Sequence, residues 1–466
     1  METIKNIHFI GIGGIGMSGV AEIMKNLGYK ITGSDQKNNS NILRLKNLGI
    51  KIFIGHNPKN ICNASLVVYS SAIQKDNCEI KKAIKLNIPV IGRSEMLKEL
   101  MRMKSTITVA GSHGKTTTVS LIAQILDKAK LDPTVINGGI INTYGSNTKL
   151  GKSNLMLVET DESDGSFSHL TSFGGVITSI DNEHIDFYGS KKKLLESFHS
   201  YIKNISPFGF LAISEKDKNI KQIIKNYKSL NIYKYGFAET CDVKAKIIKE
   251  KKDGIIFDVE IKNPNKKRLY IKGIDFPFLG YHNVENALAA ISVCLNFKIN
   301  INIIKSSLES FQGVKRRLTK IYDNKNIIFY DDYAHHPTEI IETINALSFN
   351  KGRLIVVIQP HRYSRLRDNY NSYIKALKGA DISLILPIFE AGEKKIKGIS
   401  SFNLVKDINK KKCSDTFYIS SFEKVKSKLN KILKPNDVVI FMGAGSISSF
   451  CNDFAKDLTS IGVNNE

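Results

Sequence analysis

Short apolar runs that end in glycine or polar residues recur along the chain, and segments with helical spacing separate many of them. Continuous apolar runs are typical of buried strands, which we expect at residues 7–10, 29–35, 66–71, 88–91, 107–110, 154–159, 175–180, 208–213, 327–332, 353–358, 382–386 and 437–442. Helical spacing marks residues 20–27, 119–126 and 283–296. Strands that alternate with helices predict parallel α/β sheets, which bind ligands at the carboxyl ends of their strands.

These elements fall into three blocks, which we interpret as domains at residues 1–104, 105–312 and 313–466. The middle block also contains a Lys-rich stretch, 243–271, in which apolar and polar residues alternate. That alternation predicts antiparallel strands, inserted into the α/β core or flanking it.

The charge of the chain is unusual, whereas the rest of its composition is that of an ordinary globular protein. A formal net charge of +24 could indicate nucleic-acid binding. The lysines are nevertheless spread along the chain, and clusters such as 191–193 and 410–412 are short and lack interleaved aromatic residues. We therefore expect no nucleic-acid partner and a surface that attracts phosphorylated, anionic substrates.

Three observations on the sequence bear on the location of the protein: its apolar runs, its N-terminus and its cysteines. No apolar run reaches the ~18 residues of a membrane span, so we expect no membrane insertion, and the N-terminus has no signal-peptide cleavage pattern. The six cysteines have no C-x-x-C spacing; they are Cys62, Cys78, Cys241, Cys294, Cys413 and Cys451. This argues against structural zinc or disulfides and for a reducing compartment, so we expect a cytoplasmic protein.

The strongest candidate for chemistry follows the apolar run 107–110 and precedes a helical segment. It is a loop of glycines, lysine and hydroxyls, formed by Gly111, Ser112, His113, Gly114, Lys115, Thr116, Thr117 and Thr118. Such a loop binds phosphate through backbone N–H groups, the helix N-terminus and the lysine, and its threonine can hold Mg²⁺. The usual pattern has four residues between its glycines, whereas this loop has two. An ordinary glycine-rich turn with an exposed lysine is the alternative.

A second glycine-rich loop, Gly11-Ile12-Gly13-Gly14-Ile15-Gly16, lies between the first strand and the first helical segment. It satisfies the G-x-G-x-x-G pattern, and Asp35 lies where a dinucleotide-binding fold places its ribose acid. Taken alone, this predicts NAD or FAD. Any diphosphate on a helix N-terminus uses the same glycines, however, and a UDP-linked sugar supplies such a diphosphate.

Acidic residues follow the next two strands of the middle block. Residues 159–164 place four carboxylates after a strand, and Glu159 is best placed to hold Mg²⁺ beside the phosphate loop. Residues 181–186 contain His184, which could bind a second metal or be a satisfied core histidine. An acidic surface loop is the alternative for the first run.

Three more polar clusters lie in the last part of the chain. Asn283 and Asn286 begin a helix and could read adenine, although a capping role is more common for Asn283. Residues 331–339 and 359–365 follow two strands of the third block. The second of these contains Arg362 and Arg365, which could clamp a carboxylate or a phosphate.

Taken together, six motifs make the chain resemble the Mur ligases over nearly its whole length. They are residues 11–19, 111–118, 159–164, 282–286, 331–337 and 359–365. The resemblance implies an N-terminal Rossmann-like UDP-binding domain, a central P-loop-type ATPase and a C-terminal Rossmann-like domain. The motifs at 331–337 and 359–365 are those of the member that adds L-alanine, whereas the phosphate loop alone indicates the wider superfamily, which includes folylpolyglutamate synthases.

The same resemblance assigns roles to individual residues. It implies a UDP-sugar site at Gly13, Gly14, Ile15, Ser70, Ser71 and Arg93, phosphate contacts from Lys115, and metal ligation by Thr116, Glu159 and His184. It places Asn283, Asn286, Arg316 and Asp332 on the nucleotide, and Tyr333, His361, Arg362 and Arg365 at the substrate end. ATP with two Mg²⁺ ions, or Mn²⁺, is the implied cofactor set, and the implied form is a monomer or homodimer.

The activity implied is the ATP-dependent joining of L-alanine to the lactyl carboxylate of UDP-N-acetylmuramate through an acyl phosphate, with Lys115, Glu159, His184, His361 and Arg362 as catalytic residues. The alternatives are a murein-tripeptide recycling ligase or a folylpolyglutamate synthase and, from another class, an NAD-linked oxidoreductase.

The chain departs from the family pattern at Ser112, usually Thr, at Gly92, often Pro, and at Asn182-Glu183, usually two acids that end in Asp. Sister ligases carry a carbamylated lysine where this chain has Phe198, so no carbamyl-lysine is expected.

Overall fold

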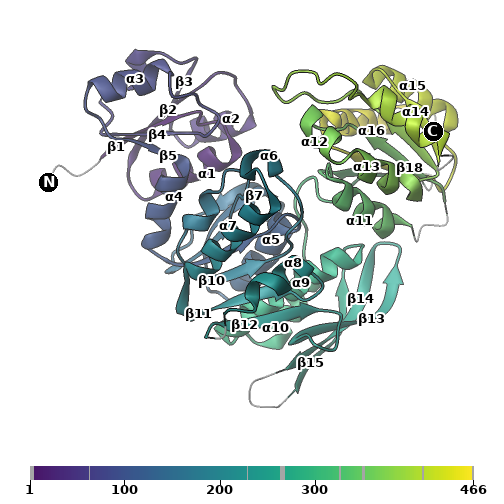
Figure 1. Cartoon of the computed structure of the whole chain (residues 1–466), viewed down its shortest axis with the longest axis horizontal. Helices are drawn as coiled ribbons and strands as arrows, with labels where there is room; N and C mark the ends of the chain where they lie inside the picture. Colours follow the sequence, from purple (N-terminus) through teal and green to yellow (C-terminus); the bar gives the residue numbers. More distant parts are fainter. Residues whose placement is uncertain are drawn as a thin grey trace. The chain divides into compact units, whose positions relative to one another are not determined.

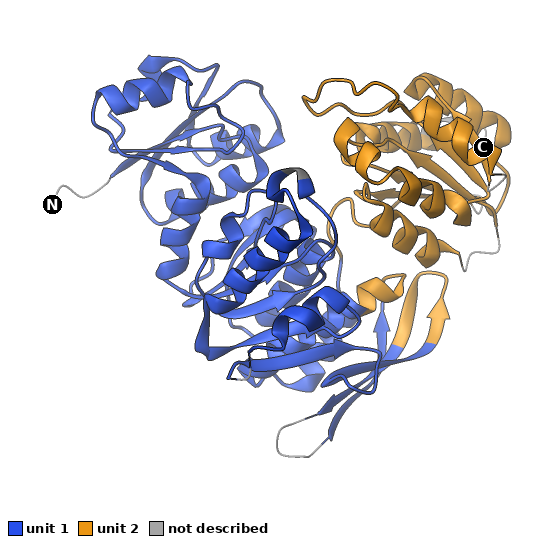
Figure 2. Ribbon diagram, viewed as in Figure 1, with its two compact units in different colours: residues 1–248, 257–276, 285–312 blue, residues 249–256, 277–284, 313–466 orange. Residues whose placement is uncertain are grey.

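The computed structural model describes residues 5–61, 63–227, 229–262, 268–324, 327–348, 352–411 and 414–463. It divides into two compact units (Figure 2): unit 1 comprises residues 1–248, 257–276 and 285–312, and unit 2 comprises residues 249–256, 277–284 and 313–466. Cys62, Lys412 and Cys413 lie outside the described residues, and the other four cysteines are free thiols.

The first sheet of unit 1 has five parallel strands in the order β3-β2-β1-β4-β5 (Figure 1). The strands are β1 (Asn6–Ile10), β2 (Lys30–Asp35), β3 (Lys51–Ile54), β4 (Leu66–Tyr69) and β5 (Val90–Gly92). The connections contain α1 (Ile15–Asn26), α2 (Ser40–Asn47), η1 (Pro58–Ile61), α3 (Cys78–Lys85) and α4 (Arg93–Arg102).

The second sheet has ten strands in the order β15-β14-β13-β12-β11-β10-β6-β9-β7-β8. The strands are β6 (Ser105–Ala110), β7 (Thr134–Ile141), β8 (Ser146–Lys149), β9 (Leu155–Glu159), β10 (Ser172–Ile177), β11 (Ile205–Ser214), β12 (Asn231–Gly236), β13 (Val243–Lys251), β14 (Gly254–Lys262) and β15 (Arg268–Phe276). The helices are α5 (Lys115–Lys128), η2 (Ser166–His169), α6 (Ile185–Tyr188), α7 (Lys191–Lys203), α8 (Lys218–Ile224), α9 (Tyr281–Cys294), η3 (Leu295–Phe297) and α10 (Ile301–Glu309).

Parallel pairing in the middle of this sheet brings three strand ends to one edge. Val109 of β6 lies opposite Glu159 of β9, and Ala110 lies opposite Ile177 of β10. The phosphate loop and both acidic runs therefore begin at neighbouring positions.

The two sheets of unit 1 share part of their hydrophobic core. Buried side chains of α1 and α4, such as Met17 and Leu100, belong to the same cluster as Ile136 of β7 and Met156 of β9. Helix α1 also packs on β7 and β8. The first two sequence blocks consequently form one packed body.

Unit 2 contains a six-stranded sheet in the order β16-β17-β21-β18-β19-β20, in which only the pair β16–β17 is antiparallel among the described residues. The strands are β16 (Thr319–Asn324), β17 (Ile327–Asp332), β18 (Leu354–Ile358), β19 (Ile382–Ile385), β20 (Asp415–Tyr418) and β21 (Val438–Met442). The helices are α11 (Pro337–Leu347), α12 (Tyr363–Asp368), α13 (Tyr370–Ala376), η4 (Leu377–Gly379), α14 (Ser401–Lys410), α15 (Phe422–Ile432) and α16 (Ile447–Val463). Apolar clusters cover both faces of the sheet.

The prediction of parallel α/β sheets is confirmed, but all three predicted helices begin earlier than expected, α1 at Ile15, α5 at Lys115 and α9 at Tyr281. Helix α9 begins at Tyr281, so Asn283 lies inside it. The Asn283 side chain donates to Leu279 O at 2.8 Å. The capping interpretation of Asn283 is therefore wrong, because a cap side chain accepts a hydrogen bond from the helix start.

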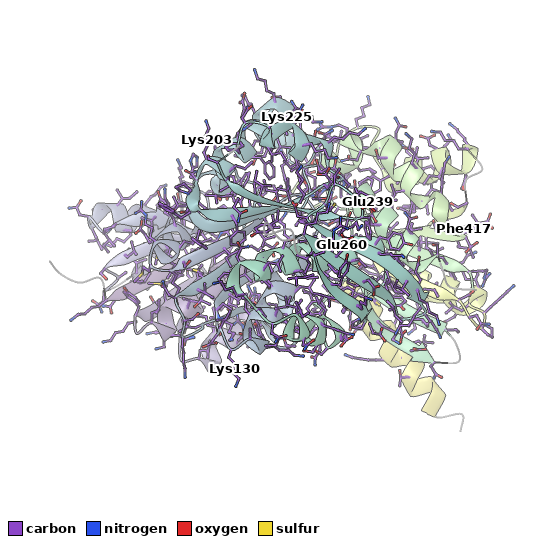
Figure 3. The ribbon with its side chains drawn as sticks, turned by 90° about the horizontal axis from the view of Figure 1, so that it is seen from below. Lys130, Lys203, Lys225, Glu239, Glu260 and Phe417 are labelled. Carbon is purple, nitrogen blue, oxygen red and sulfur yellow. The ribbon has the colours of Figure 1, made fainter. Side chains whose placement is uncertain are left out.

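The lysines of unit 1 are spread over many elements, although some share one, as Lys191, Lys192, Lys193 and Lys203 share α7. In the view of Figure 3, Lys203 and Lys225 lie at the upper side of the protein and Lys130 lies at its lower side. Within the part of the chain that the structure describes, no helix combines the length and the apolar character needed to cross a membrane.

Candidate phosphate-binding and substrate sites

The phosphate loop is shaped by two glycines that no other residue could replace without strain. Gly111 has φ +130°, and a Cβ there would lie 2.3 Å from Thr178 Oγ1. Gly114 has φ +81°, and a Cβ there would lie 2.4 Å from Asn286 Oδ1. Both conformations are in the region that favours glycine, and both positions are closed by a neighbouring segment.

The short spacing of the loop is compensated by the segment that follows β10. Ser112 N donates to Ser179 O at 2.9 Å, and His113 N donates to Ser179 Oγ at 3.0 Å. In return, Asp181 N donates to Ser112 Oγ at 2.9 Å. These bonds fix a loop with only two residues between its glycines at the start of α5.

Lys115 is the first residue of α5, and Glu162 binds its side chain. Lys115 Nζ lies 2.9 Å from Glu162 Oε1 and 2.8 Å from Glu162 Oε2, and it also donates to Gly111 O. Burial alone would lower the pKa of Lys115, but the charges of Glu162 and Glu159 raise it, so the ammonium stays protonated. The structure thus confines a permanent positive charge to the loop.

Thr116 and Glu159 lie together at the start of the same helix. Thr116 Oγ1 donates to Glu159 Oε1 at 3.0 Å, and Gly138 N donates to Glu159 Oε2 at 2.6 Å. A hydroxyl and a carboxylate next to a phosphate loop form the ligand set that Mg²⁺ prefers. Thr117, which belongs to the predicted phosphate-binding loop, is buried in the first turn of α5.

His184 lies within the second acidic run, and its φ is +56°. Its Nε2 is 4.0 Å from Glu162 Oε1. Ligand atoms of Glu162, Glu183 and His184 all lie within 4.8 Å of one another, so these residues could hold a metal ion. Phe198, which the resemblance aligns with the carbamylated lysine of sister ligases, is fully buried and packs on Phe167, with ring centroids 4.9 Å apart.

Several backbone amides of the N-terminal glycine loop donate hydrogen bonds to other residues of the chain. Gly11 N donates to Ser34 O at 2.8 Å, and Gly13 N donates to Asp35 Oδ2 at 2.8 Å. Asp35 therefore holds the loop, whereas a dinucleotide-binding fold would use this acid for a ribose hydroxyl. The geometry disfavours the NAD interpretation.

The start of α1 faces an arginine. Gly14 precedes the helix, which begins at Ile15, and a Cβ on Gly16 would lie 2.3 Å from Arg93 Nη1. Arg93 also lies 3.9 Å from the carboxylate of Asp161. A helix N-terminus beside a guanidinium suits a diphosphate.

Ser70 and Ser71 follow β4 at the same edge of the first sheet. Ser70 N donates to Ile10 O at 3.1 Å, next to the glycine loop. The structure thus brings together the residues that the resemblance assigns to the UDP-sugar.

In unit 2, Arg316 and Asp332 help to position Tyr333. Arg316 Nη2 donates to Gly443 O at 2.6 Å, and its guanidinium lies over the Tyr333 ring, 4.9 Å from the centroid. The carboxylate of Asp332 accepts from Leu318 N and Ala334 N, each at 2.7 Å. Burial raises the pKa of Asp332 to about 6. Its assignment to the nucleotide ribose stays a prediction.

His361 lies after β18, between Arg365 and Phe389. Arg365 Nη1 lies 3.2 Å from His361 Nδ1, and Phe389 stacks on the imidazole with centroids 5.6 Å apart. Because a guanidinium only donates, Nδ1 is the acceptor and the neutral ring carries its proton on Nε2. Burial and the charges of His335 and Arg365 lower the pKa of His361 to about 4, so the ring is neutral near pH 7.

Arg362 begins the turn into α12 in a left-handed conformation, with φ +68°. Ser364, two residues on, donates through N and Oγ to the Glu393 carboxylate at 3.0 and 2.6 Å. Within the described part of the chain, Arg362 Nε is buried and has no hydrogen-bond partner. An unpaired guanidinium N–H beside His361 suits a substrate carboxylate.

Sequence reasoning did not assign roles to Glu162, Ser179 or Glu393. The acidic run 159–164 was a signal for Glu162, but nothing in it distinguishes one carboxylate from the next. Ser179 and Glu393 act through residues distant in sequence, so no local pattern identifies them.

Three family models match consecutive parts of the chain. The Mur ligase family, catalytic domain, matches residues 6–105, the Mur ligase middle domain matches residues 109–294, and the Mur ligase, glutamate ligase domain, matches residues 316–445.

Full-length relatives give the same result. The chain is 43% identical to a UDP-N-acetylmuramate--L-alanine ligase of Rickettsia bellii, over 98% of this chain and 97% of the relative. It is 44% identical to the protein of that name from Pelagibacter ubique, over 95% and 96%. Among solved structures, UDP-N-acetylmuramate-alanine ligase of Thermotoga maritima matches with a TM-score of 0.80 and 26% identity, over 98% and 99%.

Proposed function

The chain belongs to the Mur ligase family, and from this we propose that it joins L-alanine to UDP-N-acetylmuramate at the expense of ATP, in the synthesis of peptidoglycan precursors. The observation that carries the proposal is identity of 43% over 98% of the chain to a relative named for this reaction. The three sites described above support it, because each suits one substrate.

In unit 1, the two phosphate-bearing substrates have separate sites. The start of α1, with Arg93, Ser70 and Ser71, suits the diphosphate of the UDP-sugar. The loop of Lys115, with Asn286 against Gly114, suits the triphosphate of ATP. Arg93 lies 3.9 Å from Asp161, which is in the same acidic run as Glu159, so one loop borders both sites.

The chemistry follows from these sites. The lactyl carboxylate attacks the γ-phosphorus of ATP, the bond to the β-phosphate oxygen breaks, and an acyl phosphate and ADP result. The amine of L-alanine, after loss of a proton, attacks the acyl carbon, and inorganic phosphate leaves. Lys115 holds the phosphate charge and fixes the geometry, because positioning and charge stabilisation dominate phosphoryl transfer.

The residues present also fit a divalent cation. Thr116 and Glu159 would hold one ion, and His184, with Glu162 and Glu183 nearby, would hold a second. Mg²⁺ or Mn²⁺ bound there would neutralise charge on the phosphate oxygens.

At the alanine end, His361 is assigned as a hydrogen-bond donor and not as the base. Its Nδ1 is used by Arg365, and its Nε2–H and the unpaired Arg362 Nε–H can both donate to the alanine carboxylate. Because UDP-linked sugars and ATP are cytoplasmic metabolites, the proposed enzyme acts in the cytoplasm. The family resemblance implies that it acts as a monomer or a homodimer.

A coupled assay of ADP release tests the proposal. We expect ADP only when UDP-N-acetylmuramate and L-alanine are both present with Mg²⁺-ATP. ADP release with the murein tripeptide in place of L-alanine would indicate the recycling ligase, and release with folate and glutamate would indicate a folylpolyglutamate synthase. NAD binding without any ADP release would overturn the ligase assignment.

A further inference from the structure

Glu162 is bound to Lys115 in a way that goes beyond a surface ion pair. Its side chain is only about 4% exposed, and both carboxylate oxygens lie within 2.9 Å of Lys115 Nζ. The backbone is fixed as well, because Tyr188 Oη donates to Glu162 O at 2.5 Å and Gly165 N donates to it at 3.2 Å. The carboxylate is therefore held in place by the fold.

The ammonium of Lys115 has used its hydrogen-bonding capacity within the protein. It can donate three hydrogen bonds, and it donates to Glu162, to Gly111 O and, at 3.4 Å, to Ser112 O. A phosphate oxygen that binds this ammonium must replace one of these acceptors. Glu162 is the only charged one among them.

A released Glu162 carboxylate would remain close to other polar groups. His184 Nε2 lies 4.0 Å from Glu162 Oε1. The carboxylate can therefore leave Lys115 without becoming an isolated buried charge, which would be costly.

We propose that Glu162 competes with the nucleotide phosphates for Lys115 and thereby sets the affinity of the loop for nucleotide. This inference rests on the ATP site of the proposed function. Glu162 holds the lysine charged and correctly placed, and each nucleotide that binds must displace it.

The test measures ATP binding to the full chain by calorimetry in excess EDTA, which removes metal ions and prevents turnover. Glu162→Gln keeps the shape but weakens the hold on Lys115, so ATP should bind on the order of tenfold more tightly, or about 1.4 kcal/mol. Unchanged or weaker binding overturns the proposal, since a merely structural Glu162 would lower Tm without raising affinity.

Asp161→Asn is the matched control for charge. Asp161 is the preceding residue, its side chain is 52% exposed, and it contacts Arg93 and not the Lys115 ammonium. Asp161→Asn removes one negative charge, as Glu162→Gln does. If both variants gained the same ATP affinity, the cause would be general repulsion between carboxylates and phosphate, and the proposal would be overturned.

Lys115→Gln provides a second control. In this background Glu162→Gln should no longer tighten ATP binding, because the competition acts through the lysine. A persistent gain would contradict the proposal. If the unmodified chain binds no ATP at all, the proposed function itself fails, which distinguishes the two failures. A larger ATP-induced rise in Tm for Glu162→Gln gives the same information without calorimetry.

Discussion

The behaviour of the candidate site depends on a few side chains whose charge or tautomer is set by their neighbours. Lys115 stays protonated because two carboxylates lie beside it. His361 stays neutral because it is buried next to arginines. The residue type alone left the protonation state of His361 open, and burial determines it, whereas at Lys115 the carboxylates offset the effect of burial.

Lys115→Ala should reduce ADP release by at least about a thousandfold, because the positive charge that holds the transferred phosphate is removed. The measurement is the coupled assay at saturating substrates. Lys130→Ala is the control, since Lys130 is exposed and lies beyond the end of α5. Turnover close to normal in Lys115→Ala would remove the lysine from the mechanism.

Arg362→Ala should raise the KM for L-alanine roughly tenfold or more, with a smaller change in the KM for ATP, because a carboxylate would lose a charged donor. Arg367→Ala, on the exposed side of the same helix, should leave the KM for L-alanine unchanged. An unaltered KM in Arg362→Ala would remove this arginine from the amino-acid site.

His361 should remain neutral well below pH 6, since its pKa is lowered to about 4. An NMR titration of the imidazole, assigned with His361→Gln, measures this directly. The unfolded chain takes up this proton near pH 6.5, so the contribution of His361 to stability is present above that pH and is lost as the pH falls toward 4. Titration near pH 6.5 in the folded protein would contradict the burial argument.

At the level of elements, buried polar residues hold the loops in position. Glu79 at the start of α3 is fully buried and accepts from Ser34 Oγ, Asn60 Nδ2 and Asn57 N at 2.6 to 3.1 Å. Ser34 also supplies the carbonyl that binds Gly11 N. One carboxylate thus ties α3 to the end of β2 and, through it, to the N-terminal glycine loop.

Glu79 should make the protein acid-labile over a defined range. Burial opposes its charge, but the His8 imidazole, 3.6 Å away, and hydrogen bonds from Ser34 and Asn60 outweigh that effect and lower the pKa from 4.5 to about 2. Its stabilisation, about 3 kcal/mol, is complete above pH 4.5 and is lost as the pH falls toward 2.

The measurement is the free energy of unfolding in urea between pH 7 and pH 3. The chain should lose more stability over this range than Glu79→Gln does, whereas the exposed Glu239→Gln should behave like the unmodified chain. Parallel pH profiles for the chain and Glu79→Gln would contradict the assignment.

At the scale of the molecule, the first two sequence blocks are packed as one body. A Cβ on Gly19 of α1 would lie 2.2 Å from Thr148 Cγ2 of β8. Thr148 Oγ1 donates to Glu22 of the same helix at 3.1 Å. This close approach couples α1 to the sheet that carries the phosphate loop.

Gly19→Ala should lower the free energy of unfolding by about 1–3 kcal/mol through overpacking, although alanine by itself favours a helix. Thr148→Ser removes the clashing methyl group and keeps the hydroxyl, so the double variant should recover most of that loss. Thermal and urea unfolding of the four variants measures the coupling. Equal effects of Gly19→Ala in both backgrounds would show that the two sheets do not meet here.

The sequence by itself determined the α/β class, the family resemblance and the residues that carry it. Apolar runs, glycine loops and strand-end polar clusters are local patterns, and a local pattern depends only on neighbouring residues. The strands that were predicted lie within a few residues of the observed ones, but β3, β7, β8, β12, β16 and β20 were not predicted. The starts of the helices and the role of Asn283 were not predicted either, since the Asn283 side chain donates to Leu279 O.

Only the tertiary structure decided how those residues are used. The short loop is held by a hydrogen bond to Ser179, and the carboxylate of Asp35 accepts a hydrogen bond from Gly13 N. Glu162 forms an ion pair with Lys115, and Arg365 fixes the tautomer of His361. Each of these contacts joins residues whose distance in space the sequence pattern does not specify. Burial and charge at such contacts set protonation and geometry, so the chemistry became definite only when the chain was folded.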